Sequence, residues 1–304
     1  MMHVLGAGSL GLLWLARLQQ AGQPCSLLVR NQATLEAWRT ADNKLIFEQQ
    51  GHQSQQQANV EVATTSDTPI QTLIVATKAH STLAAVESVR HRLSKRSQIL
   101  LLQNGLGAQQ QVSDAFTEQR VLYASVTDGA WQPAPRHVIW AGQGTTLIGD
   151  PLEQPAPEWL KQLDSNAVQW QWDDNIVAVL WRKLAVNCAI NPFTLLFDCV
   201  NGEVPNVAGS WLDECIAELQ ALLTSQAVPH LDDLATQIYE VIRRTANNSS
   251  SMRQDLHAKR RTELNYILGY ACRQGQHERI PTPALNRLLH AAQQRLAELD
   301  LPVD

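Results

Sequence analysis

Cysteine and basic residues are sparse in this sequence, and their arrangement excludes several classes of protein. The 304 residues include five cysteines, an odd number, and no two of them form a Cys-x-x-Cys pair. This pattern predicts reduced thiols in a cytoplasmic protein rather than a disulfide scaffold. No histidines and cysteines have the spacing of a zinc site, so we expect no metal. The formal net charge of −5 and the lack of a basic run argue against a nucleic-acid partner.

Long apolar runs are missing as well. No run approaches the roughly 20 apolar residues of a membrane span, so we expect no membrane partner. The first residues carry no charged segment ahead of an apolar core, and Gly6 and Gly11 interrupt the opening run, so we expect no signal peptide. A chain of 304 residues with a hydrophobic fraction of 44% is long enough for two globular domains with separate cores.

The first half of the chain alternates short apolar runs with helical patterns, which is typical of a parallel sheet with crossover helices. The patterns predict helices at 10–19 and 83–93, and strands at 3–5, 26–30, 72–76, 99–103, 121–126, 137–140 and 145–148. The glutamine-rich segment 47–57 is expected to be an exposed hairpin or loop without chemistry. Residues 151–157 are expected to form a loop before another helix.

The second half is dominated by long helical patterns, at 176–190, 208–226, 231–244, 252–273 and 283–298. We therefore predict an α/β fold in which residues 1–174 form a Rossmann-type parallel-sheet domain that binds a dinucleotide. Residues 175–304 are predicted to form a mainly α-helical domain that binds the substrate and carries catalytic residues.

A glycine-rich turn stands between the first predicted strand and the first predicted helix. Gly6 allows a tight turn, Gly8 lets the backbone approach a pyrophosphate, and Gly11 lets the helix pack closely on the sheet. The start of the helix then offers N–H groups and a positive dipole to phosphates. The predicted cofactor-binding residues of this turn are Gly6, Ala7, Gly8, Ser9, Leu10 and Gly11.

Arg30 ends the second predicted strand, where a site for NAD usually has an acidic residue. The chain has no acid from Arg30 until Glu36. A guanidinium can pair with a 2′-phosphate, so we predict that the cofactor is NADP(H).

Lys183, Asn187 and Asn191 recur at spacings of four residues in an otherwise apolar segment. On a helix this spacing stacks the three side chains into one polar stripe. An ammonium and two amides on a buried helix are costly unless a polar group faces them, and a small polar substrate would supply that group. The alternative is a solvated face that ends at Asn191 with Pro192 as a helix stop.

Ligands of an open parallel sheet bind outside the carboxyl ends of its strands. Lys78 follows one predicted strand and is expected to reach a cofactor phosphate or ribose, and Asn104 follows the next and is expected near the nicotinamide. Small residues up to Ala130 could line the cofactor.

Polar residues also gather in the helical half. Asn201 lies in a predicted loop, and Asn248 and Ser251 lie at the start of a predicted helix, a natural seat for a carboxylate. Ser251 with Gln254 also fits a capping box, which is the alternative role for Ser251. Glu263 is expected inside the same helix, near Lys259 and two arginines, either as a functional carboxylate or in a surface salt bridge.

With these residues in view, the chain closely resembles the ketopantoate reductase (2-dehydropantoate 2-reductase) family, nearly from end to end. The Lys183 segment is the most specific part, because no general dehydrogenase pattern predicts it. The other matching segments are the 6–11 turn, Lys78-Ala79, Gln103-Asn104-Gly105, Asn201-Gly202-Glu203, residues 248–252, residues 262–267 and Pro281-Thr282-Pro283.

The resemblance implies reduction of ketopantoate to pantoate by NADPH, in the pathway to pantothenate and coenzyme A. It implies that Lys183 donates the proton and that Glu263 and Ala130 contact the cofactor region, with an active site between the two domains. The residues implied in substrate binding are Asn104, Lys183, Asn187, Asn191, Asn201, Asn248 and Ser251. A related 2-oxo acid reductase and a non-catalytic NADP(H)-binding sensor remain as alternatives, and the chain could be a monomer or a homodimer.

We expect the Arg30→Ala substitution to weaken the binding of NADPH much more than that of NADH, because only NADPH carries the 2′-phosphate. Titration of the purified protein with each dinucleotide measures this difference. An equal loss of affinity for both would remove Arg30 from recognition of the phosphate.

Overall fold

The computed structural model describes residues 1–163 and 168–303. Contacts between residues divide the chain into two compact units. The first comprises Met1–Gln103 and Ala108–Val177, and the second comprises Asn104–Gly107 and Ala178–Asp304. The predicted α/β class is confirmed, with a parallel-strand sheet in the first unit and mostly helices in the second.

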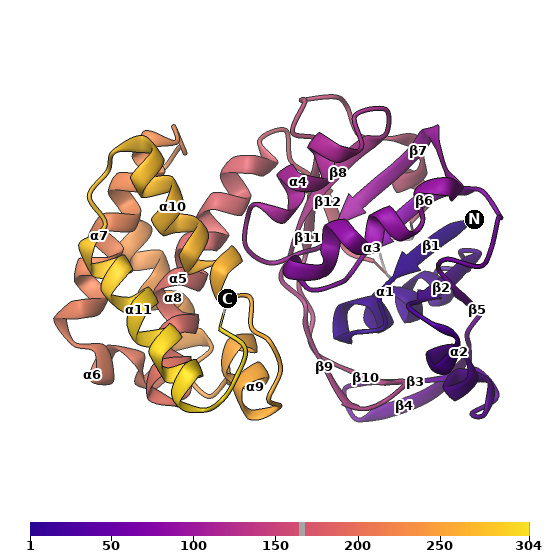
Figure 1. Ribbon diagram of the computed structural model, residues 1–304, viewed down its shortest axis with the longest axis horizontal. Helices are drawn as coiled ribbons and strands as arrows, with labels where there is room; N and C mark the ends of the chain where they lie inside the picture. Colours follow the sequence, from indigo (N-terminus) through magenta and orange to yellow (C-terminus); the bar gives the residue numbers. More distant parts are fainter. Residues whose placement is uncertain (164–167, 304) are drawn as a thin grey trace. The chain divides into compact units, whose positions relative to one another are not determined.

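An eight-stranded sheet forms the centre of the first unit (Figure 1). Its strands, in spatial order, are β12 (Trp170–Trp172), β11 (Thr146–Gly149), β8 (Arg120–Val126), β7 (Leu93–Leu101), β6 (Ile70–Val75), β1 (Met2–Leu5), β2 (Cys25–Val29) and β5 (Val60–Val62). All neighbours pair in parallel except β11 with β8. Strands of a sheet covered on both faces are nearly continuous apolar runs, and Leu73, Ile74 and Val75 are fully buried.

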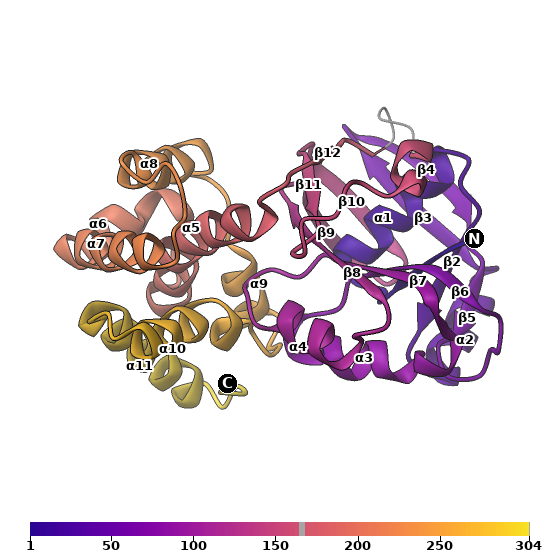
Figure 2. The same cartoon turned by 90° about the horizontal axis from the view of Figure 1, so that it is seen from above.

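Helices cover both faces of this sheet. Helix α1 (Ser9–Gln20) lies on one face, and α3 (Thr82–Ser88) and α4 (Ala108–Ala115) lie on the other (Figure 2). Helix α2 (Gln32–Arg39) follows β2, and the side chain of Asn31 caps its first turn by accepting from the Thr34 N–H at 2.9 Å. The helix expected at 83–93 is shorter, because a 3₁₀ turn at Arg90–Arg92 replaces its second half. The helix expected after the 151–157 loop is likewise a 3₁₀ turn, Glu158–Gln162.

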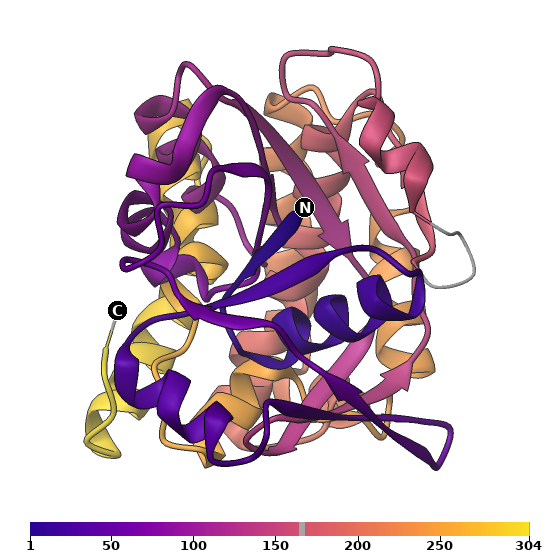
Figure 3. The ribbon, with the colours of Figure 1, turned by 90° about the vertical axis from the view of Figure 1, so that its right-hand side faces the viewer.

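A second sheet of four strands, in the order β4-β3-β10-β9, belongs to the same unit. Strands β3 (Lys44–Gln49) and β4 (His52–Gln57) form the hairpin that projects in Figure 3, so the hairpin alternative for the glutamine-rich segment is confirmed. Phe47 in this hairpin is nevertheless buried, because it packs on Trp140 of β10 (His137–Gly142). The fourth strand, β9, is Gly129–Ala134.

A buried ion pair joins α1 to the start of β9. The Nη1 of Arg17 donates to the Oδ2 of Asp128 at 2.8 Å, and both side chains are fully buried. The other carboxylate oxygen of Asp128 accepts from the Trp140 indole at 2.9 Å and from the Gly144 N–H at 3.0 Å. Asp128 therefore fixes several donors in the core of this unit.

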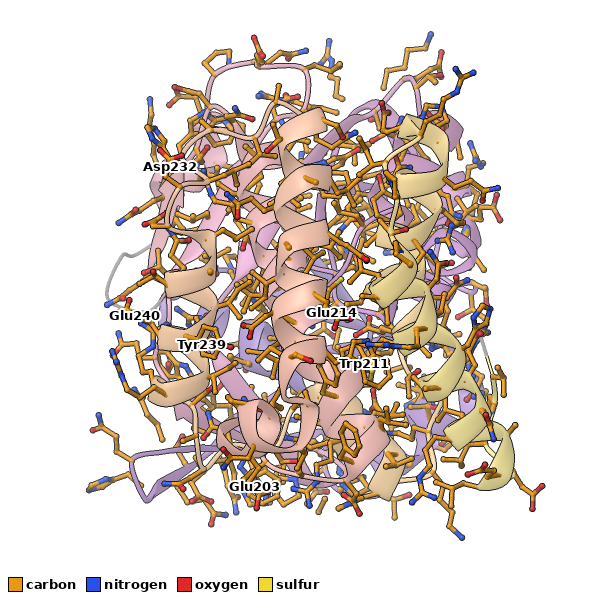
Figure 4. All side chains as sticks on the ribbon, turned by 90° about the vertical axis from the view of Figure 1, so that its left-hand side faces the viewer. Glu203, Trp211, Glu214, Asp232, Tyr239 and Glu240 are labelled. Carbon is orange, nitrogen blue, oxygen red and sulfur yellow. The ribbon has the colours of Figure 1, made fainter. Side chains whose placement is uncertain are left out.

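The second unit is built from helices. They are α5 (Ile176–Phe197), α6 (Val204–Ala208), α7 (Ser210–Ser225), α8 (Leu234–Arg244), α9 (Ser251–His257), α10 (Leu268–Glu278) and α11 (Pro283–Glu298). Helix α7 packs between its neighbours (Figure 4): the hydroxyl of Tyr239 on α8 donates to Asp213 on α7 at 2.7 Å, and the indole of Trp211 donates to the Ala284 carbonyl at 3.1 Å. Burial and the Asp213 carboxylate raise the pKa of Tyr239 to about 12.

The prediction of one helix over residues 252–273 was wrong, because α9 ends at His257. Lys259 adopts a left-handed conformation with φ of +50° and donates its N–H to Leu256. The Arg260 N–H donates to the Asp255 carbonyl at 2.8 Å, which completes a Schellman-type helix end. Glycine usually occupies the position of Lys259, so the sequence carried no signal for this stop.

Helix α5 continues through Pro192 to Phe197, so Pro192 is not a helix stop. The helix is long and apolar enough to cross a membrane, with a mean hydropathy of 1.2, contrary to the expectation that no run approaches that length. The polar residues Lys183, Asn187 and Asn191 interrupt its apolar sequence, so the sequence contains no unbroken apolar run of this length. Of its most apolar stretch, 67% is buried inside the protein, as in a core helix.

We expect Asp128→Ala to lower the free energy of unfolding of the first unit by about 3–5 kcal/mol, because it removes the partner of a buried guanidinium. Chemical denaturation measures the loss. The matched control is Glu36→Ala, which breaks an exposed pair with Arg39 and should cost less than about 1 kcal/mol. Equal losses of unfolding free energy in both variants would contradict a greater stabilisation by the buried pair.

Candidate functional site

The turn between β1 and α1 has the close backbone approach that its glycines predict. Gly6 has a φ of +111°, and a Cβ atom on it would lie 3.1 Å from the backbone of Ala76. A Cβ on Gly11 would lie 1.9 Å from the Gly6 carbonyl oxygen, so only glycine fits there. A Cβ on Gly8, by contrast, would meet nothing within 4 Å. Open space at Gly8, beside the start of α1, leaves room for a phosphate group.

The other predicted residues of the first unit follow neighbouring strands of the sheet. Arg30 directly follows β2 and is exposed, and Lys78 follows β6 and is half-buried. Because β1, β2 and β6 run parallel side by side, the glycine turn, Arg30 and Lys78 share one edge of the sheet. Ala130 lies on β9 of the smaller sheet, half-buried opposite Trp140.

Gln103 also belongs to this edge, although we did not single it out as a site residue. Its Nε2 donates to the carbonyls of Val75 at 2.9 Å and Thr77 at 3.2 Å, which joins the ends of β6 and β7. Its Oε1 is buried without a hydrogen-bond partner among the described residues. No local sequence pattern signals this role, because both partners are distant in the sequence.

The segment that begins at Asn104 packs on the turn that follows Glu263 in the second unit. The segment Asn104–Gly107 packs on Tyr266: the Leu106 N–H donates to the Tyr266 carbonyl at 2.9 Å, and a Cβ on Gly105 would lie 2.2 Å from that oxygen. The Tyr266 N–H in turn donates to the Glu263 carbonyl at 3.0 Å. Glycine at 105, with φ of +76°, is therefore what holds Asn104 beside this turn.

Glu263 lies outside the helix in which it was expected. It precedes the 3₁₀ turn Leu264–Tyr266 and is 5% exposed. The alternative of a salt-bridged glutamate on the surface of a helix was therefore wrong, because Glu263 is buried and lies outside a helix. Arg260, expected beside Glu263, pairs instead with Asp255 at 3.1 Å.

The polar stripe lies along α5 as predicted from its spacing. Lys183 and Asn187 are half-buried and Asn191 is 8% exposed, while Leu184, Ala185 and Cys188 between them are buried. The solvated-face alternative does not fit a stripe that is buried to this degree.

Two hydroxyl groups connect α5 with the start of α9. The Thr194 hydroxyl donates to the Asn191 carbonyl at 2.8 Å and lies 2.6 Å from the Ser250 hydroxyl. The Ser250 oxygen accepts from the Arg253 N–H at 3.1 Å, so Ser250 is the helix cap. The capping box at Ser251 was wrong by one residue, and Ser251 is the exposed first residue of α9.

Asn201 completes this group in the second unit. Its N–H donates to the Asn248 carbonyl at 3.0 Å, and its Nδ2 donates to the Thr245 hydroxyl at 2.9 Å. Its Oδ1 is buried without a partner among the described residues. The structure thus joins Asn201 to Asn248 and links Asn191, through Thr194 and Ser250, to the start of α9, of which Ser251 is the first residue.

Neither metals nor thiolates are indicated by the side chains present. Within the described ranges, no three His, Cys, Asp or Glu residues could hold a metal ion. All five cysteines are free and buried. Burial is the main cause that raises the pKa of Cys215 and of Cys272 to about 12, so these thiols are protonated near neutral pH.

Comparison with known proteins gives matches along nearly the whole chain. The family model described as ketopantoate reductase PanE/ApbA matches residues 2–153, and its C-terminal counterpart matches residues 175–296. A 2-dehydropantoate 2-reductase from Vibrio cholerae is 33% identical over 293 residues, 94% of each chain. One from Escherichia coli O157:H7 is 31% identical over 98% of this chain and 95% of its own.

The fold has equally complete counterparts among solved structures. A PanE/ApbA family ketopantoate reductase from Ralstonia eutropha superimposes with a TM-score of 0.87 at 25% identity, covering 99% of this chain and 100% of that one.

We expect Ser250→Ala to lower the free energy of unfolding of the second unit by about 1–2 kcal/mol, because it removes a helix cap and the partner of Thr194. The neighbouring Ser251→Ala variant is the control and should stay within about 0.5 kcal/mol of the parent. Denaturation of both variants measures the difference. A larger loss in the Ser251 variant would contradict the assignment of the cap.

Proposed function

This chain belongs to the ketopantoate reductase family, and from this premise we propose that it reduces 2-dehydropantoate to (R)-pantoate with NADPH. The reaction would serve the synthesis of pantothenate and coenzyme A. The observation that carries the proposal is the polar stripe on α5, in which Lys183 and Asn187 are half-buried and Asn191 is buried. A protein that only bound a dinucleotide would need the glycine turn but not this stripe.

The first unit fits a dinucleotide. The open space at Gly8 beside the N-terminus of α1 suits a pyrophosphate, and the exposed Arg30 suits a 2′-phosphate. Lys78 would add a cation, and Ala7, Ser9, Leu10 and Ala130 would line the cofactor. When bound, the reduced nicotinamide supplies the hydride that adds to the C2 ketone of the substrate.

Lys183 is the proposed proton donor. Negative charge develops on the ketone oxygen as the ketone is reduced, and an ammonium group stabilises that charge and delivers the proton. The ammonium must stay protonated near neutral pH, and a carboxylate favours the charged form. We propose that the buried carboxylate of Glu263 favours the charged form of Lys183 in this way.

The amides of the second unit would bind the substrate. Amide groups both donate and accept, so Asn187, Asn191 and Asn248 can orient the hydroxyl, ketone and carboxylate of the substrate. The Oδ1 of Asn201, which has no partner in the described parts of the chain, is an acceptor that a substrate hydroxyl would satisfy. Ser251 at the start of α9 would seat the carboxylate, and Asn104 would lie between cofactor and substrate.

We expect Lys183→Ala to lower kcat for ketopantoate by about 10²-fold or more, because it removes the general acid. Steady-state oxidation of NADPH measures the change. The control is Lys161→Ala, at an exposed lysine of the first unit paired with Glu158, which should leave kcat unchanged. Turnover like that of the parent in the Lys183 variant would remove Lys183 from the mechanism.

A further inference from the structure

A groove in the second unit has a lining that includes none of the residues used in the proposed function. It runs between α10 and α11 and has a volume of about 660 Å³. Sites for small molecules commonly have volumes of about 300–1,000 Å³, so the groove is large enough for one. None of the residues predicted for catalysis, cofactor binding or substrate binding lines it.

The charge of the groove comes from Arg273 on α10. The lining includes the side chains of Arg273 and His290 and contains no aspartate or glutamate. The Nη1 of Arg273 donates to the Oδ1 of Asn265, and its Nη2 donates to the Asn265 carbonyl at 2.9 Å. Both acceptors are neutral, and Arg273 forms no ion pair among the described residues. The guanidinium is thus held in place while its charge remains available to an anion.

Glu218 on α7 does not neutralise this charge. Its carboxylate contributes, after burial, to the raised pKa of Cys272, a residue in the lining of the groove. However, its two oxygens accept from the Ala284 N–H at 2.7 Å and the Leu285 N–H at 2.9 Å. Glu218 therefore caps the first turn of α11, where the helix dipole favours a negative charge.

Asn286 on α11 offers an acceptor in the same groove. Its Nδ2 donates to the Thr282 carbonyl at 2.6 Å and to the Thr282 hydroxyl at 2.9 Å. Because both amide protons are used, the Oδ1 is the atom left for a ligand, and it can only accept. Ile280 and Leu289 add an apolar surface to the lining.

We propose that this groove binds a short aliphatic carboxylate that bears a hydroxyl group. The carboxylate pairs with the guanidinium of Arg273, and the hydroxyl donates to the Oδ1 of Asn286. The aliphatic part packs on Ile280 and Leu289. None of its lining residues belongs to the proposed active site, and the proposal does not depend on the proposed function.

Isothermal titration of the full chain with 2-hydroxyisovalerate tests the proposal. We expect saturable binding that Arg273→Gln weakens about tenfold or more, because a charge-assisted hydrogen bond is lost. The control is Arg244→Gln, which removes the same charge from an exposed position on α8 and should leave the affinity unchanged. No binding, or equal binding in the two variants, would overturn the proposal.

The same titration on the Lys183→Ala variant separates the groove from the proposed active site. A groove ligand binds this variant with unchanged affinity. Binding that is lost in Lys183→Ala and kept in Arg273→Gln would place the ligand in the proposed active site and overturn the groove assignment. Such a result would leave the proposed function intact.

Two further probes test the chemistry of the ligand. Isovalerate lacks the hydroxyl and should bind several times more weakly than 2-hydroxyisovalerate, and Asn286→Ala should remove this difference. Inorganic phosphate should bind more weakly still, because it has no aliphatic part. Equal affinity for all three anions would overturn the hydroxy acid as the ligand.

Discussion

The close approach of two backbone segments at the β1–α1 turn is the constraint on which the first unit depends. A side chain at Gly11 would collide with the Gly6 carbonyl, so α1 can begin directly at the end of β1 only with glycine there. Helix α1 is then buried from Gly11 to Leu18, which places Arg17 in the core against Asp128. One turn therefore sets both the open space at Gly8 and the anchoring of the smaller sheet.

In the second unit, the largely buried helix α5 carries a stripe of polar side chains, Lys183, Asn187 and Asn191. The Thr194 hydroxyl satisfies the Asn191 carbonyl, and its hydrogen bond with the Ser250 hydroxyl joins α5 to α9. The Oδ1 of Asn201 remains buried without a partner among the described residues. A stripe of this kind is costly in a purely structural helix. Its cost is understandable if a small polar molecule binds along it, which is the basis of the proposed reductase activity.

Much of the fold could be predicted because its signals are local. The glycines at 6, 8 and 11, the apolar strands and the start of α11 at Pro283 are each encoded within a few residues. The stop of α9 at Lys259 was missed because its signal is a backbone conformation that lysine rarely adopts. Glu263 was misplaced for the same reason, and Gln103 was missed because its role depends on strand neighbours distant in sequence.

The most direct test of the proposed activity is the oxidation of NADPH by the purified protein with ketopantoate as substrate. The same assay with 2-oxoisovalerate, with pyruvate and with NADH in place of NADPH sets the specificity. The expected result is fast turnover confined to ketopantoate and NADPH. Fast turnover of another 2-oxo acid but not ketopantoate would contradict the assigned substrate, and tight NADPH binding without turnover of any 2-oxo acid would point to a sensor.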